Sequence, residues 1–134
     1  MFPRLLLDTH VLIRWLIDSK KLSRQQVRAL DTAVRRTEPL AISAISLLEI
    51  AILVSESKLR LKAPLDEFFE ELQANPIFRL LPLTFEIASE VAALGSGLRD
   101  PTDHVIVATA RIHTLRLLTS DEHIVESKLA PVLD

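Results

Sequence analysis

Four acidic residues stand beside or within apolar segments, and they are the side chains of this chain best suited to chemistry. Asp8 follows the apolar run 5–7, and Asp121 comes shortly after the apolar run 115–118. Asp103 begins an apolar helical pattern, and Glu49 lies inside another. If these acids share a site, two carboxylates about 4 Å apart repel by roughly 4 kcal/mol at an effective dielectric of about 20. Such a cluster needs protons or a cation.

A divalent cation is the simpler way to balance this charge. An all-oxygen set of ligands suits Mg²⁺, with Mn²⁺ as a second possibility. Mg²⁺ takes only one or two protein carboxylates directly and keeps several waters, which leaves room for substrate oxygens. Such an ion can activate a water and stabilise charge on a phosphate. The acids therefore predict metal-dependent phosphodiester hydrolysis.

Each acid also has a structural alternative. Asp100-Pro101-Thr102-Asp103 is a good helix start, in which Asp100 is the N-cap and Asp103 belongs to the first turn. Asp8 and Asp121 could each cap the helix that follows. Glu49 could form a buried salt bridge.

Basic and imidazole side chains near the acids are candidates for substrate contacts. Arg14 and Arg99 could each bind a phosphate, although ordinary surface charge is the common alternative. His104 follows Asp103 and could contact substrate or carry a proton. A zinc site is disfavoured because the four histidines form no His-x-x-x-His pair and the chain has no cysteine.

The acids must be positioned by the elements around them. Short apolar segments that read as strands (4–7, 40–42, 78–83 and 115–119) alternate with helical patterns. This alternation predicts an α/β fold with a parallel sheet, whose strand ends are where ligands bind. Pro82 favours an edge position for the third strand.

Side-chain patterns also predict caps and inner helix faces. Ser43 and Thr84 are predicted helix N-caps. For the helix after Ser43 we expect Ile45, Leu48 and Ile52 on one inner face, which Leu47, Ile50 and Leu53 widen, so that the helix is buried on most sides. For the helix after Asp100 the expected inner stripe is Val105, Ala108, Thr109 and Ile112.

Composition limits the class of protein. The 134 residues are 49% hydrophobic and 25% charged, which predicts one domain over 1–134. The absence of cysteine favours a reducing compartment, and no segment reads as a signal peptide or a membrane span, so we expect a cytoplasmic protein. A net charge of −2 gives no global attraction to nucleic acid, so RNA binding would need local clusters such as Lys58, Arg60 and Lys62.

The sequence resembles the PIN domain, specifically the VapC-like toxin ribonucleases of bacterial toxin–antitoxin pairs. Four segments carry the resemblance: 6–12 (LLDTHVL), 43–51 (SAISLLEIA), 99–108 (RDPTDHVIVA) and 117–121 (LLTSD). The resemblance implies a three-layer PIN-like fold with a central parallel sheet of four to five strands. Asp8, Glu49, Asp103 and Asp121 match the acidic quartet of the family, which implies that all four are catalytic and metal-binding, with Asp8 and Asp103 as direct metal ligands. Thr9 matches a polar residue beside the first acid, and we expect it to bind substrate.

One departure from the family pattern matters. Such proteins often read Asp-Pro-Phe-Asp-Arg where this chain has residues 100–104 (DPTDH). Both acids are retained, but His104 would hold an RNA phosphate less firmly than arginine. The resemblance further implies a small VapB-like antitoxin, a homodimer formed through helices, and structured RNA such as tRNA or rRNA as substrate. The alternative is a non-catalytic PIN-like module that binds RNA or a protein partner.

Overall fold

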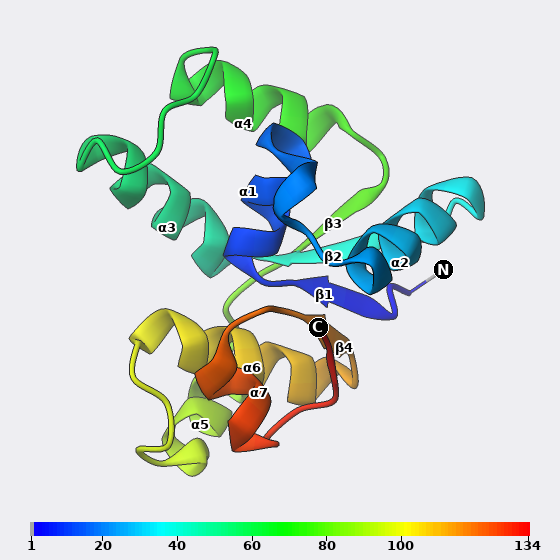
Figure 1. The fold of residues 1–134 in the computed structure, drawn as a ribbon. Coiled ribbons are helices and arrows are strands. Elements are labelled where there is room, and N and C mark those ends of the chain that lie inside the picture. The colour runs from blue at the N-terminus through cyan, green and yellow to red at the C-terminus, as the bar shows by residue number, and fades with distance from the viewer. Residues whose placement is uncertain (1) are drawn as a thin grey trace.

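A parallel β-sheet lies between two layers of helices in the computed structural model, which describes residues 2–134 (Figure 1). The strands are β1 (Leu5–Leu7), β2 (Leu40–Ser43), β3 (Phe78–Leu81), β4 (Arg116–Leu118) and β5 (Val132–Leu133). They are all parallel and lie in the order β3-β2-β1-β4-β5. This confirms the predicted three-layer α/β fold with four to five strands.

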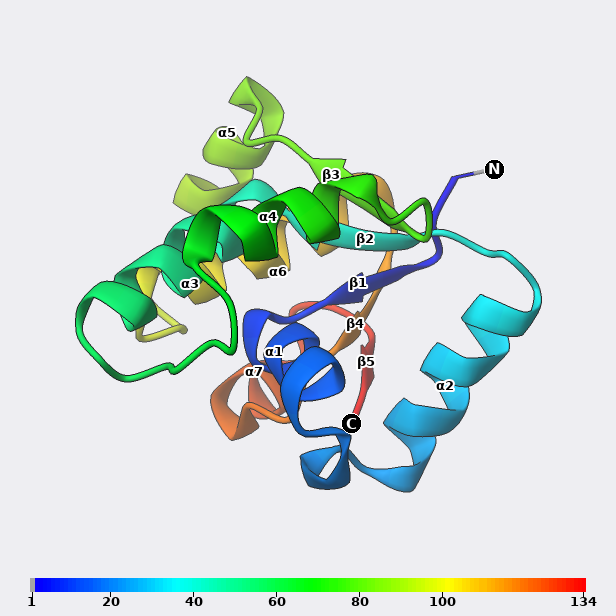
Figure 2. The ribbon, with the colours of Figure 1, turned by 90° about the horizontal axis from the view of Figure 1, so that it is seen from above.

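The helices divide between the two faces of the sheet (Figures 1 and 2). One face is covered by α1 (Thr9–Ile17), α2 (Arg24–Arg35), α3 (Ala44–Ser55) and α4 (Leu65–Ala74), and the 3₁₀ helix η1 (Ser19–Lys21) joins α1 to α2. The other face is covered by α5 (Phe85–Leu94), α6 (Pro101–His113) and α7 (Glu122–Ser127).

Alternation along the central strands supplies both cores. Leu7 packs into the core under α1 and α2, whereas its neighbour Leu6 packs into the core under α6. Leu118 and Leu117 divide in the same way on β4. A strand with both faces covered reads as a continuous apolar run, which is why these segments lack polar alternation.

Several local predictions are confirmed. The Ser43 hydroxyl accepts a hydrogen bond from the Ile45 N–H at the start of α3, and the Thr84 hydroxyl accepts one from Ile87 N–H at the start of α5. Strand β3 lies at one edge of the sheet, so Pro82, which follows it directly, interrupts no inner ladder.

The predicted inner face of α3 is correct only in part. Ile50 is fully buried as expected, and Ser46 is buried with it, while Leu48 is 55% exposed and Ile52 is 45% exposed. The helix is apolar on nearly all sides, so its pattern could not show which side faces the sheet. A buried hydrogen bond between Ser46 and Thr9 of α1 fixes the orientation that the structure adopts.

The inner stripe predicted for α6 is correct only in part. Ala108 and Thr109 are buried as expected, but Val105 and Ile112 are only half-buried. The buried segment is instead the continuous stretch 106–110, because α6 is packed on more than one side, against α5 and the sheet.

Among residues 2–134, no helix combines the length and the apolar character that crossing a membrane requires.

Candidate metal centre

Strands β1 and β4 bring the first of the predicted acids against a threonine. The two strands pair in register, with Leu7 opposite Leu118, so the residues that follow them meet at the same end of the sheet. There the Thr119 hydroxyl donates a 2.8 Å hydrogen bond to Oδ2 of Asp8, and the Asp8 N–H donates to the carbonyl of Leu118. Asp8 is only 4% exposed, so this hydroxyl is a significant partner for its carboxylate.

Thr119 is a residue of this site that the sequence did not single out. Besides donating to Asp8, its hydroxyl accepts a 3.1 Å hydrogen bond from the N–H of Asp121. It therefore links the first acid to the last. Its position could have signalled this, because it is a polar residue at the end of a buried strand, two places before an acid.

Asp121 caps the helix that follows it, which is the structural alternative given for this residue above. Its Oδ1 accepts hydrogen bonds from the N–H groups of His123 (2.9 Å) and Ile124 (3.2 Å), which caps α7. These bonds fix the side chain near Asp103, and the negative charge of Asp121 raises the pKa of Asp103. Capping occupies one oxygen, so the role does not exclude metal binding by the other.

Asp103 lies in an environment that disfavours its ionised form. It lies half-buried in the first turn of α6, and its pKa is raised to about 7 from an ordinary value of 3.8. Burial is the largest cause, and the charges of Asp121, Asp8, Asp100 and Glu49 follow in that order. The fold thus brings all four predicted acids near one another at the carboxyl edge of the sheet.

The environment of Asp8 also disfavours the ionised form of its carboxyl group. Burial raises its pKa above the ordinary value, and the charge of Glu49, which lies half-buried on α3, raises it further. The hydrogen bond from Thr119 and the nearby His10 act in the opposite direction. Crowded acids with raised pKa values are typical of metal and catalytic sites, although structural networks produce them as well.

The donor atoms of the four acids suit a metal ion, but the geometry of a metal site is not preformed. Within the described part of the chain, no three His, Cys, Asp or Glu side chains already stand close enough to hold one ion. Hard carboxylate oxygens fit Mg²⁺ or Mn²⁺, and Mg²⁺ needs only one or two of them together with waters. An open set of four acids therefore fits this group of cations.

The comparison with known families decides which fold family carries this site. The profile of the PIN domain matches residues 5–128. This chain belongs to the PIN domain family. Among curated proteins, the PIN domain is similar to ribonuclease VapC22 from Mycobacterium tuberculosis, with 32% identity over 120 residues, 89% of this chain and 88% of the relative.

Solved structures share the fold. FitAcB from Neisseria gonorrhoeae matches with a TM-score of 0.70 and 24% identity, over 97% of this chain and 96% of that one. DNA-bound VapBC from Salmonella typhimurium matches with a TM-score of 0.72 and 15% identity, over 99% and 98%. Identities this low show the three-layer fold and nothing more.

The other predicted site residues of this PIN domain lie around the acids in different ways. Thr9 is fully buried and shares a 2.7 Å hydrogen bond with Ser46, so we assign it to the packing of α1 on α3 and not to substrate contact. Arg14 is half-buried on α1. Arg99 is exposed in the connection between α5 and α6.

His104 is already engaged within the protein. Its Nδ1 lies 2.9 Å from the carbonyl oxygen of Asp100, and its Nε2 lies 3.1 Å from the carbonyl oxygen of Gly95. The imidazole thus fastens the connection before α6 onto the helix that carries Asp103. Asp100 occupies the N-cap position, as expected, but its side chain makes no capping hydrogen bond.

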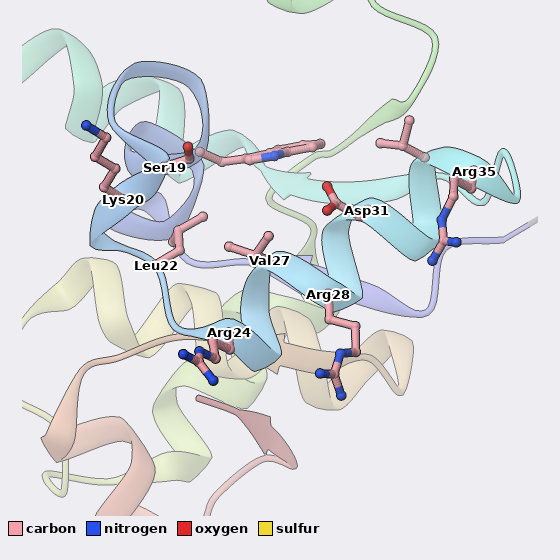
Figure 3. Close-up of a pocket in the computed structure, with 10 residues that line it drawn as sticks. Ser19, Lys20, Leu22, Arg24, Val27, Arg28, Asp31 and Arg35 are labelled. Carbon is pink, nitrogen blue, oxygen red and sulfur yellow. The ribbon is translucent and has the colours of Figure 1, made fainter.

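A large hollow of the PIN domain lies away from the acids. It measures about 990 Å³ and opens between α1, η1 and α2 (Figure 3). Trp15, Leu22 and Val27 line its apolar part, and the guanidinium groups of Arg24 and Arg28 lie along its lower side in the figure. None of the four acids lines this hollow.

Proposed function

We propose that this PIN domain is a metal-dependent endoribonuclease, acting as the toxin of a VapBC-type toxin–antitoxin pair. The observation that carries the proposal is the meeting of four acids at the carboxyl edge of the sheet, where Thr119 links Asp8 to Asp121 and where burial and the neighbouring carboxylates raise the pKa of Asp103 to about 7. A divalent cation bound between these acids would offset part of their mutual repulsion. Similarity to a ribonuclease over most of the chain supports RNA as substrate.

In this proposal Asp8, Glu49, Asp103 and Asp121 hold the cation, with Asp8 and Asp103 in direct contact. A bound Mg²⁺ would supply an activated water and neutralise charge on the scissile phosphate. Thr119 orients the Asp8 carboxylate through its 2.8 Å hydrogen bond, and the cap on α7 orients Asp121. The positive charge of the cation would favour the ionised form of Asp103, whose pKa burial and neighbouring carboxylates raise in the metal-free protein.

The decisive experiment is a cleavage assay on total cellular RNA, with the cut ends mapped by sequencing. Wild-type protein is expected to make discrete cuts with Mg²⁺ and none with EDTA. Asp103→Asn keeps the shape of the side chain but removes its charge, and it should lower the rate by a factor of about 100 or more. Asp31→Asn, an exposed acid on α2, is the matched control and should cut at the wild-type rate.

Two outcomes would overturn the nuclease proposal. One is the absence of any metal-dependent cut. The other is equal cutting by Asp103→Asn and the wild type, which would place the activity elsewhere. Either result would favour the alternative of a non-catalytic PIN module that binds RNA or a protein. The mapped cuts would also test whether tRNA or rRNA is the substrate.

The proposed partners are a VapB-like antitoxin and a second copy of the chain. Solved relatives include VapBC2 from Rickettsia felis bound to a promoter DNA fragment and a toxin–antitoxin complex from Klebsiella pneumoniae, which supports the antitoxin. For the homodimer, support comes from exposed apolar side chains at β3 and α5: Leu80, Leu83 and Phe85.

A further inference from the structure

A small hollow of about 240 Å³ lies along the seam between α1 and α3, on the same face of the sheet as α2 and α4. We call it the seam groove. The residues that matter to the argument come from α1, η1, the connections beside them and the end of α3: His10, Arg14, Asp18, Lys21, Leu53 and Lys58. None of them belongs to the four acids of the candidate metal centre.

Two residues of the seam groove lie within about one helical turn of an acid of the candidate metal centre. His10 lies two residues after Asp8, and its charge already influences the pKa of that acid. On α3, Leu53 lies four residues after Glu49, which puts both on the same side of the helix one turn apart. The buried hydrogen bond between Thr9 and Ser46 holds the two helices together where the seam begins.

Charge in the seam groove is opposite to charge at the metal centre. Three side chains that are cationic at neutral pH, Arg14, Lys21 and Lys58, face one carboxylate, Asp18. Lys58 also lies 3.3 Å from Glu56, a contact between two well-exposed side chains that contributes little energy. A net positive groove beside an acidic centre is an unusual local feature in a chain of net charge −2.

The backbone at the end of α3 directs Lys58 into the groove. Ser57 adopts a positive φ of 58°, which ends the helix and turns the chain back on itself. The N–H groups of Lys58 and Leu59 then both donate to the carbonyl of Leu53. This left-handed turn usually uses glycine. Here it places a lysine against α1, which carries Arg14.

We infer that the seam groove binds the phosphate backbone of single-stranded RNA next to the phosphate that lies at the carboxylates. A strand passing over the acids would meet repulsion there, and the cations of the groove would offset it one helical turn away. The groove positions substrate and does not cut it. This inference rests on the proposed function and adds the path of the RNA strand.

The test measures RNA binding without cleavage. Fluorescence anisotropy of a short labelled single-stranded RNA of mixed sequence is recorded in EDTA, over a series of salt concentrations, with the Asp103→Asn protein as background. Into this background go Arg14→Gln, the exposed Lys58→Gln, and both together. The matched control is Arg79→Gln, which removes the same charge from β3 at the far edge of the sheet.

The double variant is expected to bind RNA at least about tenfold more weakly at low salt. Its slope of log affinity against log salt should fall by about 1.4, since each lost phosphate contact on a single strand removes about 0.7. Arg79→Gln should keep the original slope. In the active protein, Arg14→Gln should raise KM for RNA while kcat is retained. Thermal melts verify that each variant is folded. If Arg14→Gln does not fold, Lys58→Gln alone provides the test.

Three results would overturn the inference. The first is an unchanged salt slope in every groove variant. The second is an equal loss in Arg79→Gln, which would mean that only net charge matters. The third is unchanged RNA affinity with lost binding to polyglutamate, which would identify a site for an acidic protein. Because binding is measured without metal or turnover, a failed cleavage assay would refute the nuclease and leave this test valid.

Discussion

At the scale of single residues, the environment of Asp103 disfavours its ionised form. Its ionised form is penalised first by burial and then by Asp121, Asp8, Asp100 and Glu49, so its pKa lies about three units above the ordinary value of 3.8. The neutral form is therefore favoured by the fold alone. Full ionisation at neutral pH needs a compensating positive charge.

We expect Asp103→Asn to stabilise the protein at pH 8 in EDTA. The folded state binds the Asp103 proton more tightly than the unfolded chain, so the ionised group destabilises the fold above about pH 7. This penalty shrinks as the pH falls from 7 and is gone below about 4. The gain from the substitution should be about 1–2 kcal/mol at pH 8, after allowing for the solvent screening of a half-exposed group.

Urea unfolding at pH 8 and at pH 4 measures this gain, and Asp31→Asn serves as the control. Addition of Mg²⁺ should stabilise the wild type and leave Asp103→Asn nearly unchanged, because binding to the folded state alone raises its stability. A variant that is less stable than the wild type at pH 8 would contradict the idea of an uncompensated carboxylate.

At the scale of elements, the strand ends were easier to predict than the contacts between them. The runs of leucine in β1 and β4 and the caps Ser43 and Thr84 are local signals, so they could be read from the sequence. The inner face of α3 could not, because its orientation depends on a hydrogen bond between residues 9 and 46, far apart in the chain. The engagement of His104 by two backbone carbonyls is equally non-local.

The connection after β4 gives an element-scale prediction. Thr119→Val keeps the side-chain shape but removes the donor to Asp8 and the acceptor for the Asp121 N–H. The Mg²⁺ concentration for half-maximal cleavage should rise about 10–100-fold, as is typical when a group that orients a metal ligand is lost. Stability should fall by about 1–3 kcal/mol, because buried polar groups lose their partners.

Thr109→Val is the control for this effect. Its hydroxyl donates only to the carbonyl of Val105 in its own helix, and the residue is equally buried. Titration of cleavage rate against Mg²⁺ compares the two variants. An equal Mg²⁺ requirement in both variants would mean that Thr119 does not support the metal centre.

At the scale of the whole molecule, one side of the sheet ends in exposed apolar surface. Strand β3 leaves its outer edge unpaired among residues 2–134, and Phe85 at the start of α5 is 96% exposed. Open edges and exposed aromatic side chains are typical of surfaces that bind another chain. We interpret this side as the contact between two copies.

Phe85→Ser is therefore expected to weaken self-association. Loss of a buried phenyl ring from each copy should raise the dimer dissociation constant at least about tenfold. Sedimentation velocity over a range of protein concentrations measures this constant. Val34→Ser provides the control, since Val34 is also exposed but lies on α2, far from α5 in both views (Figures 1 and 2). A wild-type protein that stays monomeric at high concentration would refute the dimer.

The hydrogen bond between Thr119 and Asp8 joins residues 111 positions apart. Strand β1, which lies at the centre of the sheet, is synthesised before its neighbour β4 and before the last acid. At about 5–20 residues per second, the chain spends on the order of ten seconds with its first acid present and its last acid missing. The nascent chain lacks the complete carboxylate site during this interval, so translation itself delays the formation of the proposed metal centre.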